Sequence, residues 1–171
     1  MFLIGMPGAG KTWWGSRVAP LLGMPFTDLD AQLMYRYRDT IAGMFEKYGE
    51  EGFRQREHDL LELLIHNLSE PAVIACGGGT PCFHDNLELM KAAGVVIYLK
   101  CEIPQLLWNL EGDTERPLLS AADAGMPQKL QTLLHQREPV YNQADMAIDV
   151  NQLELSTFEQ TIRSCTKRQS S

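Results

Sequence analysis

The sequence predicts an α/β fold, with a five-stranded parallel sheet between two layers of helices. Short apolar or β-branched runs alternate with longer helix-like stretches along the chain, as in repeated strand and helix units. The runs are mostly apolar or β-branched, which is typical of strands that helices cover on both faces. The predicted strands are residues 2–5, 25–30, 72–76, 95–100 and 146–150.

Helical patterns fill the intervals between these strands. The predicted helices are residues 11–22, 30–37, 40–66 with a break at Gly49, 85–93, 103–110, 127–142 and 155–167. In the first helix, Pro20 removes a backbone hydrogen bond and crowds the preceding turn. We therefore expect that helix to kink or end near Ala19.

Composition limits the classes of function. The chain has 171 residues, 44% of them hydrophobic, which is typical of one globular domain. A net charge of −7 argues against nucleic acid or a membrane surface as the main partner. We find no export signal or membrane-span pattern and no paired cysteines of redox or zinc type. We therefore expect a cytoplasmic protein with reduced thiols, and we also expect it to be a monomer.

The most specific motif is the segment Gly-Met-Pro-Gly-Ala-Gly-Lys-Thr at residues 5–12. It matches G-x-x-x-x-G-K-[ST] and lies between a predicted strand and a predicted helix, which is the context of a phosphate-binding P-loop. The backbone amides of Gly8, Ala9 and Gly10 should cradle the phosphates. Lys11 should reach the β- and γ-phosphates, and the Thr12 hydroxyl should bind Mg²⁺.

A P-loop leaves the phosphate acceptor open. A GTPase would need the guanine-binding motif N-K-x-D. Its nearest match, residues 142–145, is Asn-Gln-Ala-Asp and lacks the lysine. The dinucleotide-binding pattern is not met either, since Trp13 stands where its third glycine would be. A small kinase remains, whose second substrate faces the phosphates.

Further polar motifs supply candidates for that second site. Asp28 and Asp30 end the second predicted strand, at the edge where open α/β sheets bind ligands. Asp30 could also simply cap the helix that follows. Arg54 lies on a predicted helix, residues 77–79 are three glycines after the third strand, and Arg116 and Arg137 follow in polar segments.

In this order, the P-loop and the segments DLD, FR, GGG, RPLL and REPVY resemble the shikimate kinase family over nearly the whole chain. The resemblance implies transfer of the ATP γ-phosphate to the 3-hydroxyl of shikimate, a step of aromatic amino-acid biosynthesis. It also implies a P-loop NTPase-type fold with strand order 2-3-1-4-5 in one domain, residues 1–171. Residues 31–66 would bind shikimate, and residues 111–124 would form a lid. The alternatives are a gluconate kinase-like enzyme and a nucleoside monophosphate kinase.

The resemblance also implies roles for individual residues. Arg54 and Arg137 would bind the shikimate carboxylate, while Asp30 would hold the hydroxyls and accept a proton. Asp28 would lie near Mg²⁺ and contact it through water. The implied catalytic residues are Lys11, Asp30 and Arg116; the ATP-binding residues are Gly8, Ala9, Gly10, Lys11, Thr12 and Arg116; the substrate-binding residues are Asp30, Arg54, Gly77, Gly78, Gly79 and Arg137; the metal-binding residues are Thr12 and Asp28.

Two positions depart from the family pattern. Cys76 stands where many members carry Thr or Ser, and a thiol is a weak hydrogen-bonding partner for the magnesium hydration shell. No arginine precedes the predicted lid, where members often stack one on adenine. We therefore expect adenine contacts from the lid itself or from residues 151–153.

Overall fold

The five predicted strands form one parallel sheet. The structure, a computed structural model, describes residues 1–111, 125–151 and 153–168. The sheet has the order β2-β3-β1-β4-β5, and each neighbouring pair is parallel. The strands are β1 (Phe2–Ile4), β2 (Phe26–Asp28), β3 (Val73–Ala75), β4 (Val96–Lys100) and β5 (Met146–Asp149). The predicted fold class and strand order are therefore confirmed.

The helices agree closely with the sequence pattern. They are α1 (Lys11–Leu22), α2 (Leu29–Tyr37), α3 (Ile41–His66), α4 (Asn86–Ala93), α5 (Ile103–Leu110), α6 (Met126–Tyr141) and α7 (Leu155–Arg168). The predicted break inside α3 is confirmed, because Gly49 has φ 69° and ψ 178°. A short 3₁₀ helix, η1 (Thr80–Cys82), was not predicted.

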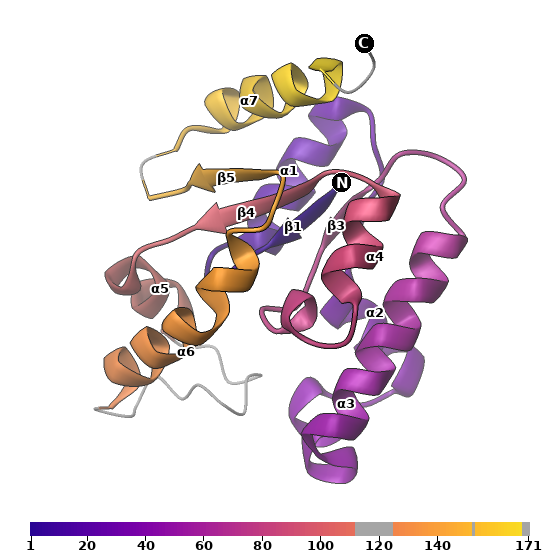
Figure 1. Ribbon diagram of the computed structural model, residues 1–171, viewed down its shortest axis with the longest axis vertical. Helices are drawn as coiled ribbons and strands as arrows, with labels where there is room; N and C mark the ends of the chain where they lie inside the picture. Colours follow the sequence, from indigo (N-terminus) through magenta and orange to yellow (C-terminus); the bar gives the residue numbers. More distant parts are fainter. Residues whose placement is uncertain (112–124, 152, 169–171) are drawn as a thin grey trace.

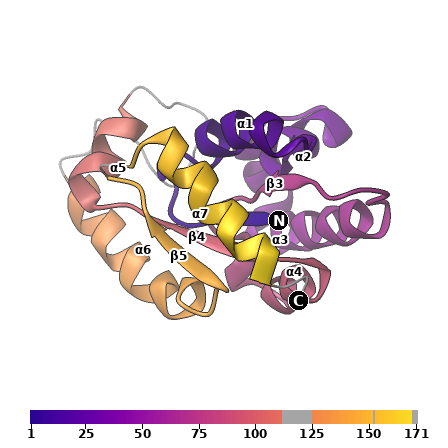
Figure 2. The ribbon, with the colours of Figure 1, turned by 90° about the horizontal axis from the view of Figure 1, so that it is seen from above.

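Helices cover both faces of the sheet. Figure 2 shows α1 on one side of the strands and α4 and α6 on the other. Helix α1 packs on β1, β2 and β3 and against α7, and α3 packs against α2 and α4. The central strands β1, β3 and the first four residues of β4 are buried along their whole length. This burial explains why their sequences are continuous apolar runs.

Of the two outcomes expected at Pro20, a kink or an end of the first helix near Ala19, the end is wrong. Helix α1 runs on to Leu22, and Gly23 then terminates it in the left-handed conformation with φ 69°. The amide of Gly23 contacts the carbonyls of Ala19 and Pro20. The missing amide of Pro20 removes one hydrogen bond of the helix, and the Gly23 amide closes the last turn beyond it.

The carboxyl ends of β1, β2 and β3 meet at one edge of the sheet, and the predicted site residues follow them (Figure 1). Strand β1 leads into the P-loop, β2 ends at Asp28, and β3 leads into Cys76 and the three glycines. Across the described ranges, each helix is too short or too polar to cross a lipid bilayer.

Candidate active site

The P-loop joins β1 to α1 as predicted. Gly8 and Gly10 have φ of 84° and 79°, a region that side chains with a Cβ rarely adopt. A Cβ on Gly8 would also lie 2.9 Å from Cγ of Leu110 in α5. From the same helix, Nδ2 of Asn109 donates to the Gly8 carbonyl at 2.7 Å. The curl of the loop is therefore fixed both by its glycines and by contacts with α5.

Lys11 lies inside this curl. Its ammonium donates to the carbonyl oxygens of Gly5 and Met6, at 2.9 Å each, and its side chain is buried. A pocket of about 520 Å³ opens here, and its wall includes Asp28 and Asp30. Predicted nucleotide-binding residues line the same pocket: Gly8, Ala9, Gly10, Lys11 and Thr12. The amino end of α1 turns the positive end of its helix dipole toward such a site.

Thr12 and Asp28 meet at the edge of this pocket. The Thr12 hydroxyl donates to Oδ2 of Asp28 at 2.5 Å, while Oδ1 of Asp28 accepts from the Ala31 amide at 3.0 Å. Asp28, and not Asp30, is therefore the residue that caps α2, because that helix begins at Leu29. The capping alternative for Asp30 is wrong, and Asp30 lies in the first turn of the helix with its side chain on the pocket wall.

The pair Thr12 and Asp28 fits a magnesium ion in its donor chemistry. A hydroxyl and a carboxylate converge there, and Mg²⁺ prefers a few such oxygens together with water and substrate phosphates. Among the described residues, no group of three or more His, Cys, Asp or Glu could hold a metal ion by itself. A magnesium ion here would therefore depend on the nucleotide for further ligands.

Arg54 is buried on α3 with a carboxylate that the sequence analysis did not single out. Its Nη1 donates to Oε2 of Glu57 at 2.7 Å, and Glu57 is itself buried. Glu50 pairs with Nη2 at 3.5 Å from a more exposed position. The guanidinium lies 4.3 Å from the ring centroid of Phe83. The spacing of Arg54 and Glu57, three residues apart on one helix, was the available signal.

The three glycines at residues 77–79 let the backbone of this turn pass close to the side chains of Asp30, Glu57 and Arg54. A Cβ on Gly77 would lie 2.9 Å from Oδ1 of Asp30 and 2.7 Å from Oε1 of Glu57. One on Gly79 would lie 2.5 Å from Nη2 of Arg54. The turn therefore brings Asp30 on α2 close to the Arg54–Glu57 pair on α3.

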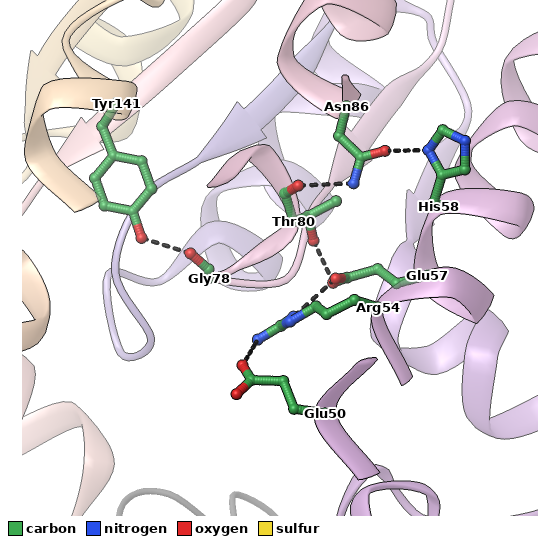
Figure 3. Close-up of polar contacts among 8 residues, drawn as sticks. All are labelled: Glu50, Arg54, Glu57, His58, Gly78, Thr80, Asn86 and Tyr141. Carbon is green, nitrogen blue, oxygen red and sulfur yellow. Dashed lines mark hydrogen bonds and ion pairs between the residues drawn. The ribbon is translucent and has the colours of Figure 1, made fainter. Parts of the chain in front are cut away.

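Helix α6 contributes Arg137 to the same region. Burial raises the pKa of the half-buried Cys82 thiol. The positive charges of Arg137 and, to a smaller extent, Arg54 act in the opposite direction. Both guanidinium groups therefore lie near the segment that follows the glycines. One turn after Arg137, the Tyr141 hydroxyl donates to the Gly78 carbonyl at 2.5 Å (Figure 3). Tyr141, like Glu57, was not among the predicted site residues, although it belongs to the REPVY segment.

The positions that depart from the family pattern lie in different surroundings. Cys76 lines the pocket, and burial, followed by the nearby Glu57 charge, raises the pKa of its thiol, which stays neutral near pH 7. Val150 and Asn151 also line the pocket, and Asn151 belongs to the segment 151–153 from which adenine contacts were expected. Trp13 also lines it and is 48% exposed, with the Arg17 guanidinium 4.1 Å from its ring centroid.

Some predicted positions lie outside the described residues. They are Arg116, residues 112–124 of the expected lid, and residue 152 of the expected adenine segment. The pocket beside Lys11 includes Asp30, whereas Arg54 and Arg137 do not line it.

Comparisons with known proteins agree with this geometry. A family model described as shikimate kinase matches residues 7–166. Shikimate kinase from Parabacteroides distasonis is 36% identical over 155 residues, covering 90% of this chain and 88% of that protein. Shikimate kinase from Methylococcus capsulatus is 40% identical over 153 residues, covering 89% and 83%.

Solved structures give the same result. Shikimate kinase from Acinetobacter baumannii in complex with shikimate has a TM-score of 0.89 and 36% identity, covering 98% of this chain and 92% of that one. A gluconokinase from Sinorhizobium meliloti, at 19% identity, a TM-score of 0.59 and coverage of 93% and 86%, shares the fold alone. The family match spans most of the chain and the relatives exceed 30% identity, so this chain belongs to the shikimate kinase family.

Proposed function

We propose that this chain is a shikimate kinase, which transfers the γ-phosphoryl group of ATP to the 3-hydroxyl of shikimate and releases ADP and shikimate 3-phosphate. The observation that carries the proposal is the buried Arg54 guanidinium beside the three glycines. Its Nε has no hydrogen-bond partner in the described part of the chain. The group therefore keeps donor capacity for the carboxylate of a small acid such as shikimate.

On the nucleotide side, the amides of Gly8, Ala9 and Gly10 bind the phosphates. Lys11 exchanges its bonds to loop carbonyls for the β- and γ-phosphate oxygens, which suits an ammonium already inside the curl. Thr12 and Asp28 would hold Mg²⁺, and the bound ion would supply positive charge to the phosphates. The protein's task is positioning and charge neutralisation, because phosphoryl transfer needs little covalent chemistry from side chains.

On the acceptor side, Arg54 and Arg137 bind the shikimate carboxylate. Paired guanidinium groups suit this task because each can donate two parallel hydrogen bonds to a carboxylate. Asp30, on the wall of the P-loop pocket, orients the 3-hydroxyl and accepts its proton. The backbone of residues 77–79 approaches the ring of the substrate.

The proposal includes the remaining expectations from the sequence. Residues 1–171 act as one domain and as a monomer in the cytoplasm, with residues 31–66 binding shikimate. Residues 111–124 act as the lid, which brings Arg116 to the transferring phosphoryl group and excludes water.

The test is ADP release from Mg·ATP in the presence of shikimate, gluconate or AMP. We expect release that depends on shikimate alone. In the same assay, Arg137→Ala should raise the KM for shikimate more than tenfold and leave the KM for ATP within about twofold. Lys129→Ala, at an exposed position of the same helix, is the matched control. Equal ATP hydrolysis with all three acceptors would contradict the proposal.

A further inference from the structure

A chain of hydrogen bonds runs from Arg54 to a histidine that no substrate-binding role explains. Figure 3 shows it: Arg54 contacts Glu57, Glu57 contacts Thr80, Thr80 contacts Asn86, and Asn86 contacts His58. His58 directly follows Glu57 on α3, so the chain begins and ends on neighbouring turns of one helix. The path leaves α3, crosses η1 and the start of α4, and returns to α3.

The first half of the chain fixes the arginine. Glu57 uses Oε2 for Arg54 at 2.7 Å and Oε1 for the Thr80 hydroxyl at 2.5 Å. Glu57 is 1% exposed and Thr80 fully buried, so water does not compete for these oxygens. A carboxylate held on both sides in this way cannot rotate freely, and the Arg54 guanidinium inherits its orientation.

The second half fixes Thr80 through its backbone. Nδ2 of Asn86 donates to the Thr80 carbonyl at 2.8 Å, and Asn86 is fully buried. Because a carbonyl can only accept, the amide orientation of Asn86 is determined, and its Oδ1 faces Nδ1 of His58 at 2.8 Å. That nitrogen must then carry the proton. His58 is therefore the donor that completes the hydrogen bonding of Asn86.

This arrangement ties the glycine turn to α3 at two adjacent residues. Thr80 directly follows Gly79, which packs on the Arg54 guanidinium. A shift of Thr80 therefore moves both surfaces that hold Arg54, namely the Glu57 carboxylate and the Gly79 backbone. The loss of the His58 donor would leave a buried Asn86 oxygen without its partner, and the amide would be free to turn away from Thr80.

We infer that His58, acting through Asn86 and Thr80, is a positioning residue for the Arg54–Glu57 pair and so sets the affinity for shikimate. The inference rests on the proposed function, because Arg54 is there the ligand of the shikimate carboxylate. His58 itself touches neither substrate in this account.

The test compares two substitutions at His58. His58→Leu removes the donor, whereas His58→Asn keeps an amide donor close to the position of Nδ1. We expect His58→Leu to raise the KM for shikimate about five- to tenfold, with kcat and the KM for ATP within about twofold of wild type. His58→Asn should restore the KM for shikimate to within about twofold.

His84 offers a matched control. Its ring lies 4.9 Å from that of His58, but the bond to Asn86 comes from His58. His84 has φ 51°, which asparagine tolerates, so His84→Asn should change no kinetic constant by more than about twofold. An unchanged KM for shikimate in His58→Leu would overturn the inference, as would equal rises in both KM values.

A measurement on the wild-type protein keeps the inference testable if His58→Leu does not fold. Nitrogen-15 NMR of the imidazole should show Nδ1 of His58 protonated. A neutral ring protonated at Nε2 alone would refute the hydrogen-bond direction. Wild-type protein without shikimate-dependent ADP release would instead refute the proposed function, so the two failures are distinguishable.

Discussion

We expect Gly79→Ala to displace the Arg54 side chain while lowering the stability of the fold only slightly. Gly79 has φ −93° and ψ −19°, which alanine adopts without strain. The added Cβ would lie 2.5 Å from Nη2 and 2.7 Å from Cζ of Arg54. An unstrained contact needs a retreat of the guanidinium by about 1 Å. The crowded atoms end a long side chain, so we expect the free energy of unfolding to fall by less than about 1 kcal/mol.

The substrate should respond more strongly than the fold. A hydrogen bond between charged groups contributes about 1.5–3 kcal/mol, and a displacement of about 1 Å forfeits most of one. That loss corresponds to a rise of about ten- to hundredfold in the KM for shikimate, since each 1.4 kcal/mol is about tenfold. The KM for ATP should stay within about twofold, because the nucleotide pocket does not include Gly79.

The assay is steady-state ADP release with each substrate varied in turn, beside urea unfolding of the same preparations. Gly94→Ala is the control, because its backbone is extended and its Cβ would come no closer than 3.6 Å to another group. An unchanged KM for shikimate in Gly79→Ala would refute the reasoning. So would a loss of more than about 2 kcal/mol of stability, which would mean that the backbone and not Arg54 yields.

Three further predictions concern other parts of the site. Tyr141→Phe removes a buried donor from the Gly78 carbonyl and should lower the free energy of unfolding by about 1–3 kcal/mol, measured by urea titration; an unchanged midpoint would contradict it. Burial raises the pKa of the Cys82 thiol, so its thiolate forms at higher pH, and its alkylation, followed by mass spectrometry, should rise at more alkaline pH than that of free cysteine. A rise at lower pH would show the opposite shift. Arg116→Ala should lower kcat more than it raises either KM, and unchanged turnover would remove it from the proposed transition state.

The sequence predicted those features that depend on neighbouring residues. Continuous apolar runs gave the buried strands, and the P-loop is a single segment whose glycines can be identified directly. Asp30 was considered as an alternative cap of α2, whereas Asp28 is the cap, because both residues are plausible caps when the helix start is uncertain by two positions. The extension of α1 past Pro20 depended on Gly23, which supplies the helix end.

Contacts between distant elements could not be predicted in the same way. Glu57 could be paired with Arg54 from helical spacing alone, but its bond to Thr80 depends on how η1 packs against α3. Tyr141 reaches Gly78 across 63 positions of the sequence, from α6 to the turn before η1. Such bonds follow from the packing of layers, and hydrophobic periodicity carries no information about them.

The buried charges of α3 are easier to explain by binding than by stability. Arg54 and Glu57 are 6% and 1% exposed, and the removal of two charges from water costs several kcal/mol before their attraction offsets it. Glu57 is fully engaged by Arg54 and Thr80, whereas Nε of Arg54 has no partner within the described residues. The carboxylate is thus satisfied by the fold and the guanidinium is not. That asymmetry is what a site for an anionic substrate requires, because the remaining donors gain their partner when the substrate binds.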